Sequence, residues 1–189
     1  MLQPERMKDE NFLKELGEYS PDVQVVVAFR MLPEVVWALP RFGTFNLHAA
    51  LLPQYRGAAP INWAIINGEE RTGVTTFFID HDIDTGRIIM QREMPIGPED
   101  NVETVYDGLM KLGAEIAIET IDRLIEGNGV VGSIPQEQMT DAAGNLHDAP
   151  KLFKENCMIN WEMSAGRVHD LIRGLSPVPG AWSPFGSDA

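Results

Sequence analysis

An apolar run at residues 23–29 is the feature that most restricts how this chain can fold. Only Gln24 interrupts it, and its Val-rich composition is typical of a strand covered on both faces, as in a parallel sheet. Residues 44–50 predict a second strand. Residues 33–39 and 59–67 predict helices, each with a proline near its start. Strands that alternate with helices in this way predict an α/β fold.

The segments on either side extend this pattern. Residues 9–19 predict a short amphipathic helix, and residues 72–79 and 86–96 predict two antiparallel strands. In the second of these strands we expect Arg87, Gln91 and Glu93 to be exposed. Residues 101–126 predict a long helix that ends at the glycines of residues 127–129, because apolar side chains recur at helical spacing. This stripe consists of Val102, Val105, Leu109, Leu112, Ile116, Ile118, Ile121 and Leu124.

The texture of the sequence changes after residue 129. Residues 1–129 form the α/β domain, the polar residues 130–155 predict a linker, and residues 156–189 predict the start of a second domain. In that last part we expect a strand edge at residues 160–163 and a helix at residues 165–175. An α/β domain usually carries a strand–helix–strand unit upstream, and only one strand precedes residues 44–50. We therefore expect the chain to be truncated at both ends.

Composition excludes several classes of protein. The 189 residues are 44% hydrophobic, which suffices for one domain or for one core and the edge of a second. The net charge of -13 and the lack of a basic run argue against nucleic-acid binding by this chain alone. A single cysteine, Cys157, excludes an internal disulfide and favours a reducing compartment. With no membrane-spanning apolar run and no secretory signal, we expect a cytoplasmic protein.

Two polar side chains interrupt the second predicted strand. Asn46 and His48 are two residues apart, so on a strand they point to the same face. A loop stiffened by proline and glycine follows at residues 51–57. Asn46 offers a neutral hydrogen-bond donor, and His48 titrates near physiological pH. With a carboxylate, these groups could hold a developing oxyanion and move one proton. An interior, hydrogen-bonded histidine beside a turn-capping asparagine remains the alternative.

Three carboxylates lie close together at residues 80–84. Calcium binding is not expected, because an EF-hand loop requires Gly at position six and Glu at position twelve, where this chain has Thr85 and Gln91. One carboxylate beside His48 would favour the protonated imidazole and hold its tautomer. The other two would accept hydrogen bonds from backbone N–H groups of the turn. The three are Asp80, Asp82 and Asp84.

Two arginines stand near these segments. Arg56 lies in the stiff loop, where it could grip an anion. Arg30 follows the first predicted strand, at the strand end where α/β sheets place ligands. For each, an ordinary solvated arginine is an equally good interpretation.

Taken together, four segments resemble the folate-dependent formyltransferases: residues 46–53, 55–61, 72–75 and 84–86. Residues 177–182 are similar to the same family's entry into its C-terminal domain. The resemblance extends over almost the whole chain. It implies a partial Rossmann-like formyltransferase domain with a mixed sheet, a linker, and the start of a C-terminal, OB-like β-barrel domain.

The resemblance also implies roles for particular residues. The family's catalytic set falls on Asn46, His48 and Asp84. Its folate-binding segment falls on Ala50, Leu51, Leu52 and Pro53, with Ala50 where the family usually has Ser. The loop that cradles the pterin ring falls on Phe29, Arg30, Met31 and Leu32. A turn that closes over the same ring falls on Asp80, His81 and Asp82.

The implied reaction is formyl transfer from 10-formyltetrahydrofolate, without a metal. The run of residues 56–61 favours the family members whose acceptor is initiator methionyl-tRNA, bound mainly through parts outside this chain. Three alternatives remain open. The acceptor could be an amino sugar nucleotide or a glycinamide ribonucleotide. The chain could bind folate without activity. Water could replace the acceptor, which would make the reaction a hydrolysis of formyl-folate.

Overall fold

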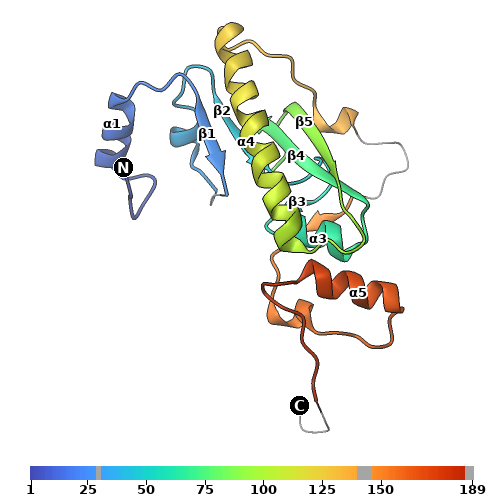
Figure 1. Ribbon diagram of the computed structural model, residues 1–189. Coiled ribbons are helices and arrows are strands. Elements are labelled where there is room, and N and C mark those ends of the chain that lie inside the picture. The colour runs from blue at the N-terminus through green and yellow to red at the C-terminus, as the bar shows by residue number, and fades with distance from the viewer. Residues whose placement is uncertain (29–30, 140–145, 186–189) are drawn as a thin grey trace.

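The computed structural model describes residues 1–28, 31–139 and 146–185 (Figure 1). The predicted succession of strands and helices in the first 129 residues is confirmed, with ends that differ by a few residues. In chain order the elements are α1 (Glu10–Glu18), β1 (Gln24–Val27), α2 (Glu34–Trp37), β2 (Thr44–His48), β3 (Arg56–Gly57), α3 (Pro60–Ile66), β4 (Arg71–Phe78), β5 (Ile88–Pro95), α4 (Val102–Glu126), the 3-10 turn η1 (Gln136–Gln138), β6 (Asp148–Ala149), the 3-10 turn η2 (Lys154–Cys157) and α5 (Ala165–Gly174).

The main sheet is mixed, as predicted. Its order is β1-β2-β4-β5, with β1 parallel to β2 and with β4 antiparallel to both β2 and β5. A second, two-stranded sheet pairs β3 with β6 in parallel. Because β6 lies within the predicted linker, this pairing ties the linker to the loop that leaves β2.

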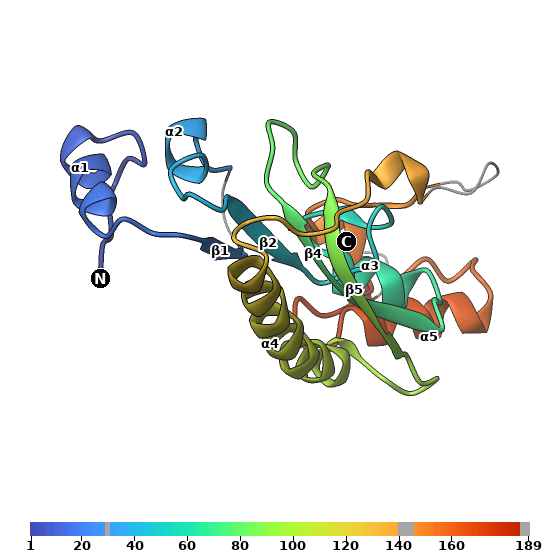
Figure 2. The same cartoon turned by 90° about the horizontal axis from the view of Figure 1, so that it is seen from above.

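Helix α4 covers one face of the main sheet (Figures 1 and 2). Its N-cap Asn101 accepts a hydrogen bond from the backbone of Thr104, and the chain leaves the helix through Gly129 at a φ of +87°. Close packing on β2 requires Gly113, since an added Cβ would lie 2.9 Å from Leu47. Among the described residues, no helix has both the length and the apolar character needed to cross a bilayer.

The apolar stripe of α4 is buried or partly buried with one clear exception. Val105, Leu109, Ile116 and Leu124 are at most 3% exposed, whereas Ile118 is 61% exposed. Ile118 lies two residues after Ile116 and therefore points about 200° around the helix from it. The prediction that Ile118 belongs to the buried stripe is wrong.

Strand β1 is covered less than its composition predicts. Val26 is buried, but Val25 and Val27 are 37% and 59% exposed. The prediction of cover on both faces is wrong, because β1 is the edge strand of the sheet and α4 packs against β4 and β5 instead. Figure 2 shows α1 on the far side of β1 from α4.

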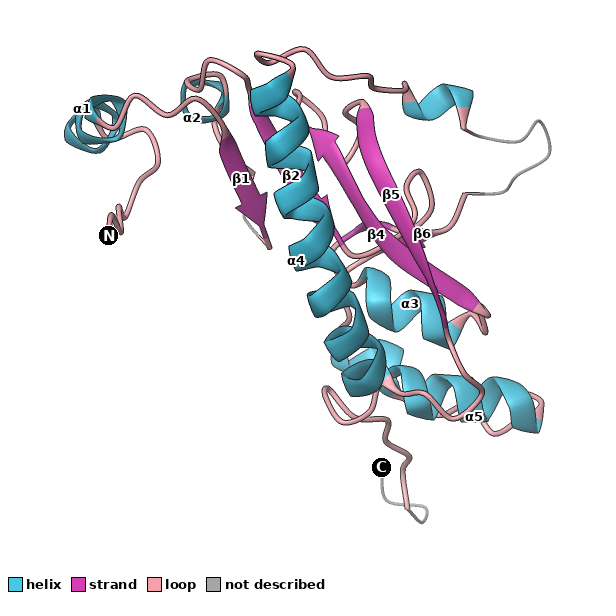
Figure 3. Cartoon of the chain, turned by 45° about the horizontal axis from the view of Figure 1, so that its top comes forward, coloured by secondary structure: helices cyan, strands magenta, loops and turns pink. Residues whose placement is uncertain are grey.

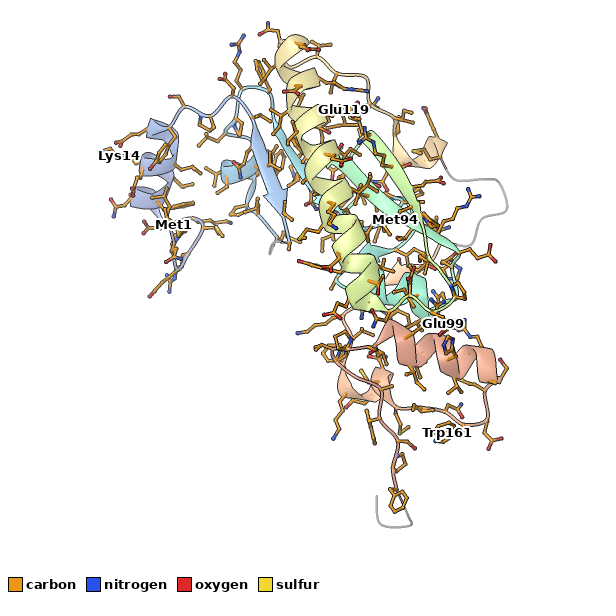
Figure 4. All side chains as sticks on the ribbon, viewed as in Figure 1. Met1, Lys14, Met94, Glu99, Glu119 and Trp161 are labelled. Atoms are coloured by element: carbon orange, nitrogen blue, oxygen red, sulfur yellow. The ribbon has the colours of Figure 1, made fainter. Side chains whose placement is uncertain are left out.

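Acidic side chains of α4 form ion pairs with Arg92 of β5. Glu119, labelled in Figure 4, forms an ion pair with Arg92 of β5 and a second one with Arg123 of its own helix. Met94, also labelled, packs under the helix where Gly108 leaves room for its side chain. These contacts fix the helix along the β4–β5 half of the sheet.

Helix α5 lies alongside α3 (Figure 3). At Gly174 an added Cβ would lie 2.6 Å from Ile66, and Asn62 donates a 2.8 Å hydrogen bond to the Gly174 carbonyl. The strand edge predicted at residues 160–163 is wrong. Those residues form a turn, because the backbone N–H of Glu162 bonds the Asn160 side chain and that of Met163 bonds the Asn160 carbonyl.

Candidate active site

Strand β2 presents Asn46 and His48 on one face, opposite Phe77 and Thr75 of β4. Both are largely buried, at 5% and 7% exposed. Since β2 has a hydrogen-bonded neighbour on each side, the backbone that carries these two side chains is held from both edges. Phe77 packs edge-on against the imidazole, with ring centroids 6.5 Å apart.

The two imidazole nitrogens of His48 have different partners. Nε2 lies 2.8 Å from the Tyr55 carbonyl oxygen, and Nδ1 lies 3.9 Å from Oδ2 of Asp84. A carbonyl oxygen only accepts, so Nε2 carries a proton in either charge state. The 3.9 Å distance is too long for a direct hydrogen bond. In the neutral ring Nδ1 is therefore an acceptor, and it donates only when His48 is an imidazolium.

Asp84 is the carboxylate that the structure brings to His48. Its backbone φ of +55° lies in the left-handed region, which a residue with a Cβ adopts rarely. The carboxylate is 11% exposed, and its Oδ2 accepts a 3.0 Å hydrogen bond from the backbone N–H of Gly57. Strained backbone of this kind persists where surrounding contacts hold it.

The other two carboxylates of the turn stay at its surface. Asp80 accepts hydrogen bonds from the backbone N–H of Asp82 and from the hydroxyl of Thr85, as expected for a residue that stabilises a turn. The exposed His81 places its ring edge-on to Trp37 at the end of α2, with centroids 5.3 Å apart. In the described part of the chain, no three His, Cys, Asp or Glu side chains gather as metal ligands would.

The predicted folate segment at residues 50–53 is tied down by two polar side chains of the sheet. The Thr75 hydroxyl donates to the Ala50 carbonyl at 2.6 Å and accepts from the Leu52 backbone N–H. Gln91 donates to the Leu52 carbonyl at 2.7 Å and to the Thr75 hydroxyl at 2.9 Å. Gln91 is thus partly buried, and the prediction that it is exposed is wrong, because its amide reaches back over the loop.

Side chains of the same segment pack inward. Ala50 and Leu52 are at most 1% exposed, Pro53 is buried, and Leu51 packs on Gly73, where an added Cβ would lie 2.5 Å from its side chain. The methyl group of Ala50 belongs to the main hydrophobic core, so the alanine fits its surroundings by packing. A ligand at this segment would meet chiefly its backbone.

The predicted pterin loop is described only in part. Phe29 and Arg30 lie outside the described residues, so the prediction that Arg30 stands at a ligand-binding strand end also falls outside them. Met31 is 68% exposed and Leu32 is partly buried, and both precede α2.

Gln136 is a residue of this site that sequence reasoning missed. Its side chain is fully buried, and its Nε2 donates to the carbonyls of Asp84 at 2.9 Å and Gly86 at 2.8 Å. Its Oε1 accepts from Nε and Nη2 of Arg56 at 3.1 and 2.6 Å. Arg56 is therefore not an ordinary solvated arginine. Two of its guanidinium N–H groups are bonded to Gln136, so only the rest of the guanidinium could bind an anion. A lone glutamine in a polar connector carries no sequence signal.

Hydrogen bonds of the Tyr55 side chain hold in place the residue whose carbonyl bonds His48. Its buried phenol donates to Glu69 at 2.5 Å and accepts from Asn67. Burial, and then the hydrogen bond to Glu69, raise the pKa of Tyr55 well above its ordinary value. The neutral phenol anchors the residue whose carbonyl oxygen accepts the Nε2 proton of His48.

Asn46 leaves one hydrogen-bonding atom without a partner. Its buried Oδ1 has none among the described residues. Buried polar atoms are nearly always paired in folded proteins, and exceptions concentrate at functional sites. The unpaired amide atom, the imidazole and the carboxylate form a set that suits a polar reacting group bound beside β2.

The sequence matches known families over most of its length. Residues 1–121 match the family described as formyl transferase, and residues 151–188 match the formyl transferase C-terminal domain. Methionyl-tRNA formyltransferase from Bacteroides fragilis is 62% identical over 183 residues, and that from Parabacteroides distasonis is 57% identical over 188. These alignments cover 97% and 100% of this chain, but only 56% and 57% of the relatives, so the chain spans just over half their length.

Solved structures share the fold. HypX from Aquifex aeolicus, in complex with tetrahydrofolic acid, has a TM-score of 0.72 at 24% identity, covering 92% of this chain and 29% of HypX. A likely sugar N-formyltransferase from Mycobacterium tuberculosis has a TM-score of 0.75 at 25% identity, covering 94% of this chain and 74% of that protein. Because the formyl transferase family matches well over half of its residues, the chain belongs to that family.

Proposed function

We propose that this chain carries the catalytic face of an enzyme that transfers a formyl group from 10-formyltetrahydrofolate to the amino group of methionyl initiator tRNA. The observation that carries the proposal is the juxtaposition of Asn46, His48 and Asp84 on and beside β2. The acceptor is favoured by relatives named methionyl-tRNA formyltransferase, which are 57% to 62% identical to this chain.

Asn46, His48 and Asp84 are the proposed catalytic residues. The formyl oxygen gains negative charge as its carbon is attacked, and it needs donors in fixed positions. Asn46 supplies a neutral amide donor. His48 donates from Nδ1 as an imidazolium, because its Nε2 proton is already bonded to the Tyr55 carbonyl. Removal of one such donor typically costs about 3 kcal/mol of transition-state stabilisation.

Asp84 is proposed to favour the imidazolium and to take part in moving a proton. The folate would supply the formyl carbon, bonded to its N10. The neutral methionine amine forms a bond to that carbon, and the bond between the carbon and N10 breaks. Asp84, acting through water, relays the amine proton toward N10, so the reaction balances without a metal or a covalent bond to the enzyme.

The residues proposed to bind folate belong to three segments of the sequence. The backbone of residues 50–53 is held by Thr75 and Gln91 and would line the site. Met31 and Leu32, with the undescribed Phe29 and Arg30, would cradle the pterin ring. The turn of Asp80, His81 and Asp82 would close over it, and its contact with Trp37 links it to α2. Tetrahydrofolic acid in the HypX structure, which has the same fold, supports this ligand class.

The domain assignment is also a proposal. Residues 1–129 would belong to the catalytic domain, residues 130–155 to a linker, and residues 156–189 to the start of an OB-like C-terminal domain. The tRNA would be bound mainly by parts of the enzyme that correspond to the rest of the longer relatives.

An acceptor panel tests the function. The 189-residue chain is incubated with 10-formyltetrahydrofolate labelled in the formyl group and, separately, with methionyl initiator tRNA, an amino sugar nucleotide, glycinamide ribonucleotide and no acceptor. We expect label on the tRNA alone, sensitive to deacylation of that tRNA. The Asn46→Ala chain is the control for a reaction at this site.

Each of the other outcomes would indicate a different function for this chain. Label on the sugar nucleotide or on the ribonucleotide would replace the acceptor. Labelled formate without any acceptor would indicate hydrolysis. Folate binding without turnover would identify the chain as a binding fragment, and the panel would then be repeated on the chain extended to the length of its relatives.

A further inference from the structure

We propose that Gln136 is the positioning residue that holds the carboxylate of Asp84 toward His48. This inference rests on the proposed function, because Gln136 would act on the reaction only through Asp84. The residue lies in η1, in the connector after α4, far from the three proposed catalytic residues in sequence. Its contacts reach both segments that fix Asp84.

The first contacts are with the turn itself. The Nε2 group of Gln136 donates to the carbonyl of Asp84 and to the carbonyl of Gly86. These two bonds fix the peptide groups that follow Asp84 and Gly86. They therefore fix the left-handed backbone of Asp84, which sets the direction in which its side chain leaves the chain.

The second contacts are with β3. The Oε1 atom of Gln136 accepts from the guanidinium of Arg56, and the next residue, Gly57, donates its backbone N–H to the Asp84 carboxylate. Hydrogen bonds and one peptide bond thus link four residues in a ring: Gln136 and Gly57 each donate to Asp84, Arg56 donates to Gln136, and the peptide bond between Arg56 and Gly57 closes the ring. Gly57 itself cannot carry a larger side chain, since an added Cβ would lie 2.5 Å from the Ala149 carbonyl.

Only a side-chain amide satisfies all of these partners. The two carbonyls need a donor, and the guanidinium needs an acceptor. The site is fully buried at Gln136, so water cannot replace a missing partner without rearrangement. A glutamate of the same shape would keep the Arg56 contact and lose both donations, which separates the effect on Asp84 from the effect on Arg56.

The connector is held by hydrogen bonds just before Gln136. Ile134 forms an antiparallel bridge with Ile88 at the start of β5, and Arg87 bonds both the hydroxyl and the carbonyl of Ser133. Pro135 then begins the 3-10 turn that contains Gln136. Gln138, in the same turn, is exposed and provides a matched control.

The test compares Gln136→Glu with Gln138→Glu in the 189-residue chain, with Gln136→Met as a second variant in case the buried glutamate prevents folding. The first readout is hydrogen exchange of the Gly57 amide, because that proton is bonded to the Asp84 carboxylate. We expect Gln136→Glu to speed this exchange roughly tenfold or more, as expected when about two hydrogen bonds are lost, and Gln138→Glu to leave it unchanged.

The second readout is formyl transfer. Misplacement of a catalytic group by about 1 Å can cost roughly 100-fold, so we expect kcat to fall about 10- to 100-fold with little change in KM for folate. In an Asp84→Asn background the same substitution should cost nothing further, because its effect passes through the Asp84 carboxylate.

Two results would overturn the proposal. One is unchanged Gly57 exchange in a folded Gln136 variant, which decides the question even if no chain transfers formyl groups. The other is an equal loss of kcat with and without the Asp84 carboxylate, which would assign Gln136 a general structural role. Failure of the parent chain to transfer any formyl group would count against the proposed function alone.

Discussion

Strands β1 and β2 run parallel and in register, yet they differ in burial. Phe45 of β2 is fully buried, whereas its register partner Val25 of β1 is 37% exposed, and Val27 beside Leu47 is more exposed still. Strand β2 has a neighbour on each edge and α4 on one face, while β1 is an edge strand. The comparison teaches that the neighbours of a strand decide its burial, whatever its own composition. The candidate site lies on the strand that is held from both sides.

We expect the largest loss of stability from a substitution in β2, the more buried of the two strands. Phe45→Ala removes a fully buried ring that packs with Ile89 and Leu124, and we expect a loss of about 3–5 kcal/mol in the free energy of unfolding. Val27→Ala should change it by roughly 0.5 kcal/mol or less, because much of that side chain already meets water. Urea denaturation of both variants measures the difference. Equal losses would mean that β1 is covered in solution.

The next effect concerns the charge at the site. Asp84→Asn keeps the shape of the side chain but removes the negative charge 3.9 Å from His48. We expect turnover to fall roughly 100-fold, within the range for loss of an acid–base group. Asp122→Asn, an exposed position on α4, is the control. Comparable turnover in the two variants would remove Asp84 from the proposed catalytic set.

A smaller effect should follow at the loop that leaves β2. Thr75→Val removes a hydroxyl that bonds the Ala50 carbonyl, the Leu52 N–H and the Gln91 amide. We expect a loss of about 1–3 kcal/mol in stability and weaker folate binding, because buried polar groups are left unpaired. The control is Thr72→Val, a buried threonine of the same strand with no side-chain hydrogen bond in the described part of the chain. Folate affinity that is equal in both variants would show that the loop does not bind the ligand.

The smallest effect extends the comparison to the C-terminal residues. Cys157 packs with Ile66 of α3 and with Leu171 and Leu175. Burial, and then the charge of Glu155, raise the pKa of the Cys157 thiol. We therefore expect its thiolate to form at higher pH in the folded chain than in the unfolded one. At neutral pH a thiol reagent should react slowly until urea unfolds the chain. Equally rapid labelling with and without urea would indicate that this part does not pack on α3.

Sequence periodicity predicted the elements that depend on local pattern. The spacing of apolar residues located α4, and strand-like composition located β4 and β5. The same reasoning failed where tertiary neighbours decide. The valines of β1 look like a doubly covered strand in any context. Ile118 is a different case, because its place two residues after Ile116 already puts it on another side of the helix. Gln91 was misassigned because the loop it bonds comes from an earlier part of the chain.

The residues of the candidate site also fall into those that local sequence pattern predicted and those that depend on tertiary neighbours. The two-residue period of a strand placed Asn46 and His48 on one face. It could not select Asp84 from three carboxylates of one turn, because that choice depends on how the turn folds back over β3. Gln136 and the Tyr55 carbonyl carry no motif, since one is a lone glutamine 52 residues after Asp84 and the other a backbone atom.

The most direct test is the single-turnover rate at which the His48→Ala chain transfers the formyl group to methionyl initiator tRNA. The dissociation constant for folate is measured on the same sample. The account predicts a rate that is lower by roughly 100- to 10,000-fold, as expected for loss of a proton-donating catalytic group, and folate binding that is nearly unchanged. An unchanged rate, or a loss explained entirely by weaker folate binding, would contradict the assignment of His48 and the site built around it.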